Sequence, residues 1–104
     1  MNKFSEREKS FEKKFMQDQE LQFKVSAKRN KYLAEWAGSK LGKNDEQRQN
    51  YVQEVIKADL EEAGDEDVFR KVKKDFENSA IKIDDSEIRN QMSLALERAK
   101  KDFI

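Results

Sequence analysis

The sequence contains no cysteine, no histidine and no proline, and it has only three glycines in 104 residues. Without cysteine, the chain has no disulfide framework, thiol nucleophile or cysteine zinc site. Without histidine, it lacks the commonest general base, metal ligand and near-neutral pH switch. The shortage of proline and glycine disfavours long irregular loops and tight hairpins. These absences predict a small all-helical protein and argue against an enzyme.

Long hydrophobic runs are missing as well. No apolar stretch approaches the roughly 18 residues that span a membrane, and no signal-peptide pattern opens the sequence. Charged residues make up 42% and apolar residues 36% of the chain, and the mean hydropathy is −1.12. The apolar residues are nevertheless too many and too regularly spaced for simple disorder. We therefore expect one soluble, cytoplasmic domain without direct membrane insertion.

The formal net charge is zero, but the charges are unevenly distributed. Residues 1–31 carry nine basic and five acidic side chains, a net charge of +4. Residues 44–67 carry two basic and nine acidic side chains, a net charge of −7. A basic N-terminal segment and an acidic middle suggest an interaction surface or internal docking.

Apolar residues at three- and four-residue spacing predict four core helices. The expected helices span about residues 19–41, 44–64, 65–77 and 84–103. Glycines are expected to end the first helix at Gly38 and Gly42 and the second at Gly64, after a stripe that includes Leu60 and Ala63. The expected caps are Asn44 or Asp45, Asp65 and Asp84. Ile81 and Ile83 are expected to tuck inward from the last connection. The pattern favours an all-α four-helix bundle with its core drawn from residues 21–103.

A further amphipathic segment precedes these helices. Ser5 and Glu8 have the spacing of a capping box, and Phe4, Phe11 and Phe15 fall on one helical face. No residue between 15 and 21 breaks a helix, so this segment and the next can be continuous. Two interpretations stay open: the phenylalanines pack on the bundle as ordinary core, or the segment lays them into the groove of a partner.

Three other clusters contain residue types that bind ligands. The acidic residues of 59–67 resemble ligands for hard cations but lack calcium-loop spacing, and the end of one helix followed by the start of another explains them better. The glycines and lysines of 38–44 lack the spacing and the strand of a P-loop. The basic residues of 24–31 are typical of a solvated helix face, and nucleic-acid binding is the weaker interpretation.

Several stretches, taken together in order, resemble one known family. They are residues 4–8, 11–15, 18–21 with 23–24, 29–30 up to 36–37, 51–55 and 57–68. The run 61–68 and the aromatic and acidic pattern of 4–23 are the most distinctive. Together these stretches closely resemble the zeta subunit of alphaproteobacterial ATP synthases, a small inhibitor of the catalytic head of the rotary enzyme.

This resemblance implies a four-helix fold with a mobile N-terminal inhibitory arm. The arm would be residues 1–19 and the helical bundle residues 20–104. In the family, the arm enters the interface between the alpha and beta subunits near the central gamma shaft and stops ATP hydrolysis. Synthesis is spared because rotation in that direction expels the arm. Carried onto this sequence, the contacts of the arm are the apolar anchors Phe4, Phe11 and Phe15 and the polar residues Arg7, Glu8 and Glu12.

The resemblance also sets expectations about partners and ligands. The partners would be the alpha, beta and gamma subunits, reached at the cytoplasmic face of the inner membrane. The free protein would be a monomer without catalytic residues, metal or resident cofactor, although weak adenine-nucleotide binding is allowed. Because histidine is absent, histidine protonation cannot gate the inhibitor. The alternative function is a small helical module that senses adenine nucleotide without inhibiting.

Overall fold

The computed structural model describes residues 6–61 and 64–104, and these residues form five α-helices and no strand. The predicted all-helical class is confirmed. The predicted contacts of Phe4 and the predicted cap at Ser5 lie outside the described residues. The helices are α1 Glu6–Gln17, α2 Gln19–Lys40, α3 Asp45–Asp59, α4 Glu66–Asn78 and α5 Asp85–Lys101.

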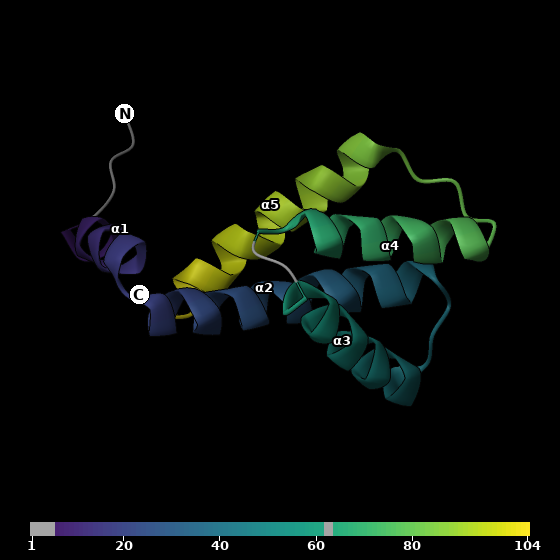
Figure 1. Cartoon of the computed structure of the whole chain (residues 1–104), viewed down its shortest axis with the longest axis horizontal. Helices are drawn as coiled ribbons and strands as arrows, with labels where there is room; N and C mark the ends of the chain where they lie inside the picture. Colours follow the sequence, from purple (N-terminus) through teal and green to yellow (C-terminus); the bar gives the residue numbers. More distant parts are fainter. Residues whose placement is uncertain (1–5, 62–63) are drawn as a thin grey trace.

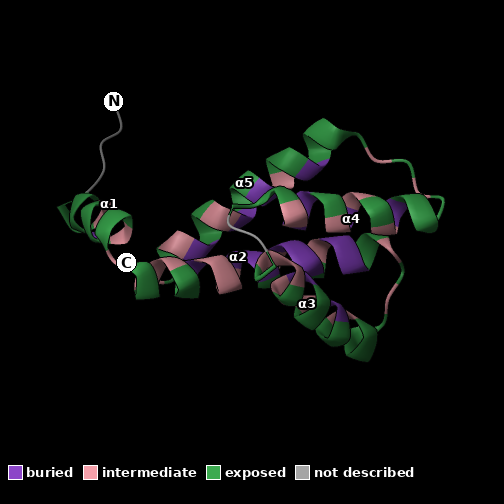
Figure 2. Ribbon diagram, viewed as in Figure 1, coloured by how far each residue is buried: buried purple, intermediate pink, exposed green. Residues whose placement is uncertain are grey.

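The long helix α2 organises the molecule, because α3 and α5 both pack along it and α4 contacts α3 and α5 (Figure 1). The first helix, α1, lies at one end of the elongated molecule and packs on α2. Buried residues line the faces that α2 to α5 turn toward one another, whereas α1 is mostly exposed (Figure 2). The described residues thus form five helices where the sequence predicted a bundle of four: α2 to α5 share the main core and are called the four-helix body, and α1 is peripheral.

The main core is drawn from the apolar stripes that the sequence predicts. Ile81 and Ile83, in the connection before α5, pack against it while partly buried, as expected. Helical spacing placed these side chains on one face of each helix, and their burial supplies the main driving force for folding. The buried members of the main core are Leu33, Ala34, Ala37, Tyr51, Val55, Val68, Phe69, Val72, Phe76, Ile88, Met92 and Ala95.

Asp18 separates α1 from α2, so the two segments are not one continuous helix. Its backbone is extended (φ −105°, ψ 105°), and its carboxylate accepts a hydrogen bond from the backbone N–H of Leu21 at 3.1 Å. Aspartate at this position satisfies an N–H at the start of α2 and therefore favours a new helix over continuation of the old one. The break gives α1 its own direction.

The predicted N-cap residues lie at the predicted positions, but only one of them makes the expected side-chain hydrogen bond to a described residue. Asn44 caps α3 in a full capping box with Gln47, each backbone N–H donating to the partner's side chain at 2.9 Å. Asp65 and Asp84 occupy the N-cap positions of α4 and α5, but neither side chain bonds to a described N–H of the helix it precedes.

Two predictions about helix ends are wrong. Helix α3 ends at Asp59 and not near Gly64, and Leu60 is 63% exposed because it lies at the C-cap, beyond the buried stripe; Ala63 lies outside the described residues. Helix α2 continues past Gly38 to Lys40, so Gly38 does not end it and instead lies buried within it. A Cβ at Gly38 would come 2.9 Å from Arg48 Cγ, so the glycine permits close approach of α3. Gly42, with φ +76°, follows the end of α2 as predicted.

Candidate functional site

The apolar face of α1 is covered by a small cluster at one end of the molecule, which we call the satellite core. Phe11 is the one buried residue of α1, with 7% of its surface exposed, and it shares this cluster with Val25 of α2 and Ala99 of α5. The rings of Phe11 and Phe15 lie 6.0 Å apart, centre to centre. The partly buried members are Phe15, Leu21, Tyr32, Leu96, Phe103 and Ile104.

Polar contacts fasten α1 on two sides of this cluster. Gln22 of α2 donates from Nε2 to the backbone oxygen of Phe15 at 2.7 Å. Lys100 of α5 donates from Nζ to Glu12 Oε1 at 3.3 Å and lies 4.7 Å from the centre of the Phe15 ring. A cation over an aromatic face is attracted by the ring quadrupole. Lys100 therefore holds two residues of α1 with one ammonium group.

The end of α5 is tied to α2 by contacts that do not involve α1. The Tyr32 hydroxyl donates to Asp102, and Lys28 Nζ lies 3.7 Å from the same carboxylate. The hydrogen bond to Asp102 raises the pKa of Tyr32 above its ordinary value, and burial adds to the shift. The guanidinium of Arg98 lies 3.8 Å from the centre of the Tyr32 ring. The surface on which α1 rests is thus held in place by its own network.

The structure gathers half of the predicted site residues at this cluster. Phe11, Glu12 and Phe15 face the satellite core or its rim. Arg7 is exposed and Glu8 is half-buried in the first turns of α1. In the state that the structure shows, Phe11 packs as core, which is one of the two interpretations that the sequence left open.

Sequence reasoning missed Gln22 and Lys100. Neither belongs to an apolar stripe, and the contact from Lys100 to Glu12 spans 88 residues of sequence. The only available signal was that Lys100 follows Leu96 by four residues and so lies beside the predicted stripe of α5. Which lysine of that basic helix end meets α1 depends on how α1 and α5 cross.

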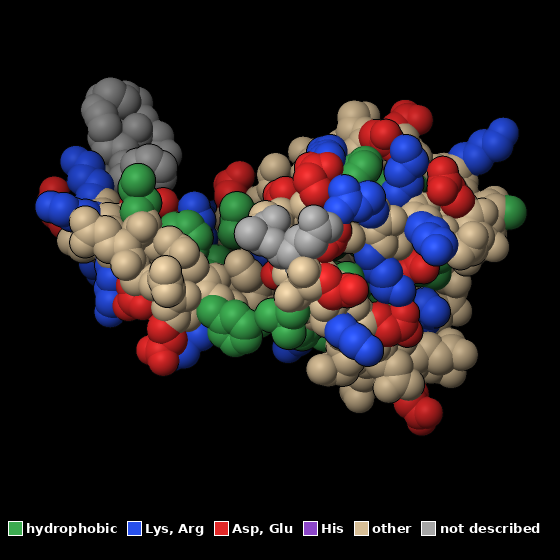
Figure 3. All heavy atoms as spheres, in the orientation of Figure 1, with side chains coloured by type: hydrophobic (Ala, Val, Ile, Leu, Met, Phe, Trp, Pro, Cys, Tyr) green, Lys and Arg blue, Asp and Glu red, His purple; other side chains and the backbone are tan. Residues whose placement is uncertain are grey.

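Exposed apolar side chains adjoin the satellite core. Phe23 and Leu60 line a shallow hollow of about 580 Å³ together with Phe15 and Leu96. Green side chains gather on this face between the end that holds α1 and the rest of the molecule (Figure 3). Arg29 and Asp59 also line the hollow and form an ion pair at 3.4 Å. These two charges of the lining therefore already neutralise each other.

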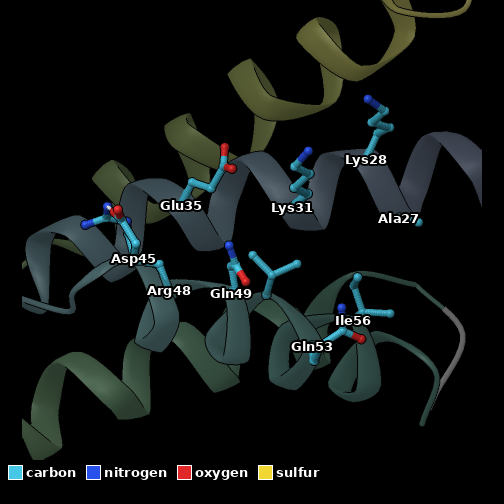
Figure 4. Close-up of a pocket in the computed structure, with 10 residues that line it drawn as sticks. Ala27, Lys28, Lys31, Glu35, Asp45, Arg48, Gln49, Gln53 and Ile56 are labelled. Atoms are coloured by element: carbon cyan, nitrogen blue, oxygen red, sulfur yellow. Dashed lines mark hydrogen bonds and ion pairs between the residues drawn. The ribbon is translucent and has the colours of Figure 1, made fainter.

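The basic and glycine-containing segments do not form a phosphate cradle. An open groove of about 770 Å³ runs between α2 and α3 (Figure 4), but Lys28 and Lys31 point away from α3. Arg48 in this groove donates to the backbone oxygen of Lys43 at 2.8 Å and pairs with Asp45. Weak adenine-nucleotide binding therefore stays a prediction without a specific site.

Much of the acidic cluster is engaged in protein contacts. Asp59 accepts hydrogen bonds from Asn30 at 2.9 Å and Arg29 at 3.4 Å, and both donors are buried. Asp67 pairs with Arg70. Within residues 6–61 and 64–104, no three acidic side chains gather closely enough to hold a metal ion. The same part of the chain contains no helix that is both long and apolar enough to cross a membrane.

The described residues define an all-helical protein whose first helix packs at the periphery, outside the main core. The sequence model for ATPase inhibitor subunit zeta matches residues 1–102, so the chain belongs to that family. The family consists of regulatory inhibitor subunits of the ATPase, which agrees with the prediction of an inhibitory regulator. A comparison with curated proteins found no match.

Proposed function

We propose that this protein inhibits ATP hydrolysis by inserting its N-terminal segment, residues 1–19, between the alpha and beta subunits of ATP synthase near the gamma shaft. Phe4, Phe11 and Phe15 are the apolar anchors, and the polar contacts come from Arg7, Glu8 and Glu12. The bundle of residues 20–104 carries the segment and performs no chemistry. Family membership supports the inhibition, and the peripheral packing of α1 supports its role as the inserted element.

The observation that carries this proposal is the contrast between α1 and the other helices. Helix α1 buries one of its 12 residues, whereas α2 buries seven of its 22. The main core includes no residue of α1. Because isolated helices shorter than about 12–15 residues are marginal in water, α1 needs a surface to pack on. That surface is the satellite core in the free protein and the ATP synthase interface in the complex.

Three further features belong to the same proposal. A segment held outside the main core can enter and leave without unfolding the body. Hydrolysis is blocked while the segment is inserted, and rotation in the direction of synthesis expels it. The free protein acts as a monomer at the cytoplasmic face of the inner membrane, where the enzyme presents its catalytic head.

The test is titration of ATP hydrolysis by the cognate ATP synthase with wild-type protein and with the double variant Phe11→Ala, Phe15→Ala. Loss of two aromatic anchors is expected to raise the half-inhibitory concentration at least about tenfold. Leu94→Ala is the matched control, because Leu94 is an exposed apolar residue of α5 outside the satellite core. Equal inhibition by all three proteins would contradict the assignment of Phe11 and Phe15 as anchors.

A further inference from the structure

We propose that the satellite core is an autoinhibitory dock and that Lys100 is its latch. In the free protein, the dock covers the apolar face of α1 that the ATP synthase must bind. The strength of inhibition is then set by competition between this intramolecular surface and the enzyme. This inference rests on the proposed function, since it concerns how the same segment becomes available.

The dock and the enzyme compete because both bind the same apolar face of α1. Phe11 is 7% exposed and packs in the cluster with Val25 and Ala99. The ring of Phe15 is partly buried there and is covered by the ammonium of Lys100 at 4.7 Å. Side chains already packed in this way cannot at the same time fill a pocket on a partner. Helix α1 must leave the dock before its phenylalanines reach the enzyme.

Lys100 is well placed to control that step. Its side chain is 23% exposed, and it joins α5 to Glu12 at 3.3 Å while also contacting Phe15. These partners lie three positions apart and so share one side of α1. Lys100 is outside the main core. Its removal should therefore weaken the dock without disturbing the four-helix body.

The dock is built to survive the departure of α1. Tyr32 and Lys28 both bind Asp102, and Arg98 stacks on Tyr32, so the end of α5 stays on α2 without help from α1. Asp18 ends α1 and begins α2, and its extended backbone marks the point at which α1 can swing away while α2 keeps its cap. A surface that persists after release allows the segment to return.

The size of the effect follows from the population of the released state. When only a fraction of molecules has a free segment, the apparent affinity for the enzyme is reduced by that fraction. Loss of this partly buried ion pair and of the cation–aromatic contact should increase the released population about three- to tenfold. The half-inhibitory concentration of Lys100→Ala should fall by the same factor.

The experiment measures two properties of wild-type protein, Lys100→Ala and Lys101→Ala. The first is the hydrogen-exchange rate of the α1 amides in the free protein, and the second is the half-inhibitory concentration in ATP hydrolysis. Lys101→Ala is the matched control: it removes the same charge one residue away, and Lys101 makes no ion pair or hydrogen bond to the described residues of α1. We expect Lys100→Ala to show faster exchange of the α1 amides and tighter inhibition than wild-type protein. Lys101→Ala should show neither change.

Two other results would overturn the inference in different ways. If wild-type protein inhibits, but Lys100→Ala inhibits no more tightly despite faster exchange in α1, the dock does not compete and the proposed function stands. If neither wild-type protein nor Lys100→Ala inhibits, the proposed function fails and the inference fails with it.

A covalent lock tests the same idea from the opposite direction. Carbodiimide treatment joins a carboxylate directly to a neighbouring amine, and the Glu12–Lys100 pair is suitable at 3.3 Å. Treated wild-type protein and Lys101→Ala should lose inhibition once the Glu12–Lys100 cross-link is detected by mass spectrometry. Treated Lys100→Ala cannot form this link and should therefore still inhibit ATP hydrolysis. Full inhibition by cross-linked wild-type protein would contradict the dock.

Discussion

At the scale of single residues, the hydroxyl of Tyr51 is a polar group held at the edge of the main core. Tyr51 is buried in the main core and donates to Asp75 at 2.8 Å. Asp75 also accepts an ion pair from Lys71 at 3.0 Å, and Lys71 in turn contacts Glu54 at 2.7 Å. This network links α3 to α4 and keeps a buried hydroxyl satisfied.

Burial, helped by the bond to Asp75, raises the pKa of Tyr51 above its ordinary value of 10.0. The folded state therefore holds this proton more tightly than the unfolded state, so the stabilisation is complete below about pH 10 and is lost as the pH rises further. Wild-type stability should fall by up to about 1.4 kcal/mol per pH unit more than that of Tyr51→Phe above about pH 10. At neutral pH, Tyr51→Phe should cost about 1 kcal/mol.

Urea denaturation from about pH 9 to about pH 11 checks this prediction. The difference in unfolding free energy between the two proteins is the measured quantity, because the lysines titrate in both and their contribution cancels. Parallel pH curves would mean that the Tyr51 phenol is not protected in the folded state.

Residue-level prediction from sequence succeeded where periodicity was the signal. Phe11 and Phe15 stood out because they repeat at helical spacing in a charged segment. Lys100 did not stand out, because it is one of several basic residues at the end of α5. Only the tertiary packing of α5 on α1 places it beside Glu12 and Phe15.

At the scale of elements, α1 differs from the other helices in what holds it. Its cluster contains three buried residues, whereas the main core contains twelve. The body should therefore keep its structure when α1 is loosened. Local release of a weakly packed element costs less free energy than global unfolding.

Two alanine substitutions distinguish local release of α1 from global unfolding of the body. Leu33→Ala removes a fully buried side chain of the main core and should lower the unfolding free energy by about 2–5 kcal/mol. Phe11→Ala should cost only about 1 kcal/mol, because the loss cannot exceed the free energy of docking α1. Urea denaturation followed by circular dichroism measures both. A loss for Phe11→Ala as large as that for Leu33→Ala would show that α1 is part of the cooperative body.

Element boundaries were the weakest part of the sequence prediction, for identifiable reasons. No strong helix breaker lies between residues 15 and 21, and the break at Asp18 arises from one carboxylate that caps α2. Leu60 continued the apolar spacing of α3 in sequence, yet the helix ends one residue earlier. Apolar periodicity registers neither the capping hydrogen bond of Asp18 nor the residue at which α3 stops.

At the scale of the whole molecule, the four core helices and their inward faces followed from the apolar stripes, since burial of those stripes leaves few arrangements. The resting position of α1 did not follow. The satellite core exists only where α2 and the end of α5 meet, and its members Val25 and Ala99 lie 74 residues apart. The sequence predicted the phenylalanine face of α1 but not the surface of α2 and α5 on which that face packs.

The central claim is that the N-terminal segment carries the inhibition while the body supports it. The most direct test is ATP hydrolysis by the cognate ATP synthase, titrated with the full chain and with a deletion of residues 1–17. The deletion keeps Asp18, because its carboxylate caps α2. Circular dichroism should show loss of about one 12-residue helix and a cooperative transition of the remaining body. We expect the full chain to inhibit and the folded deletion to be inactive; inhibition by the deletion at full strength would contradict this account.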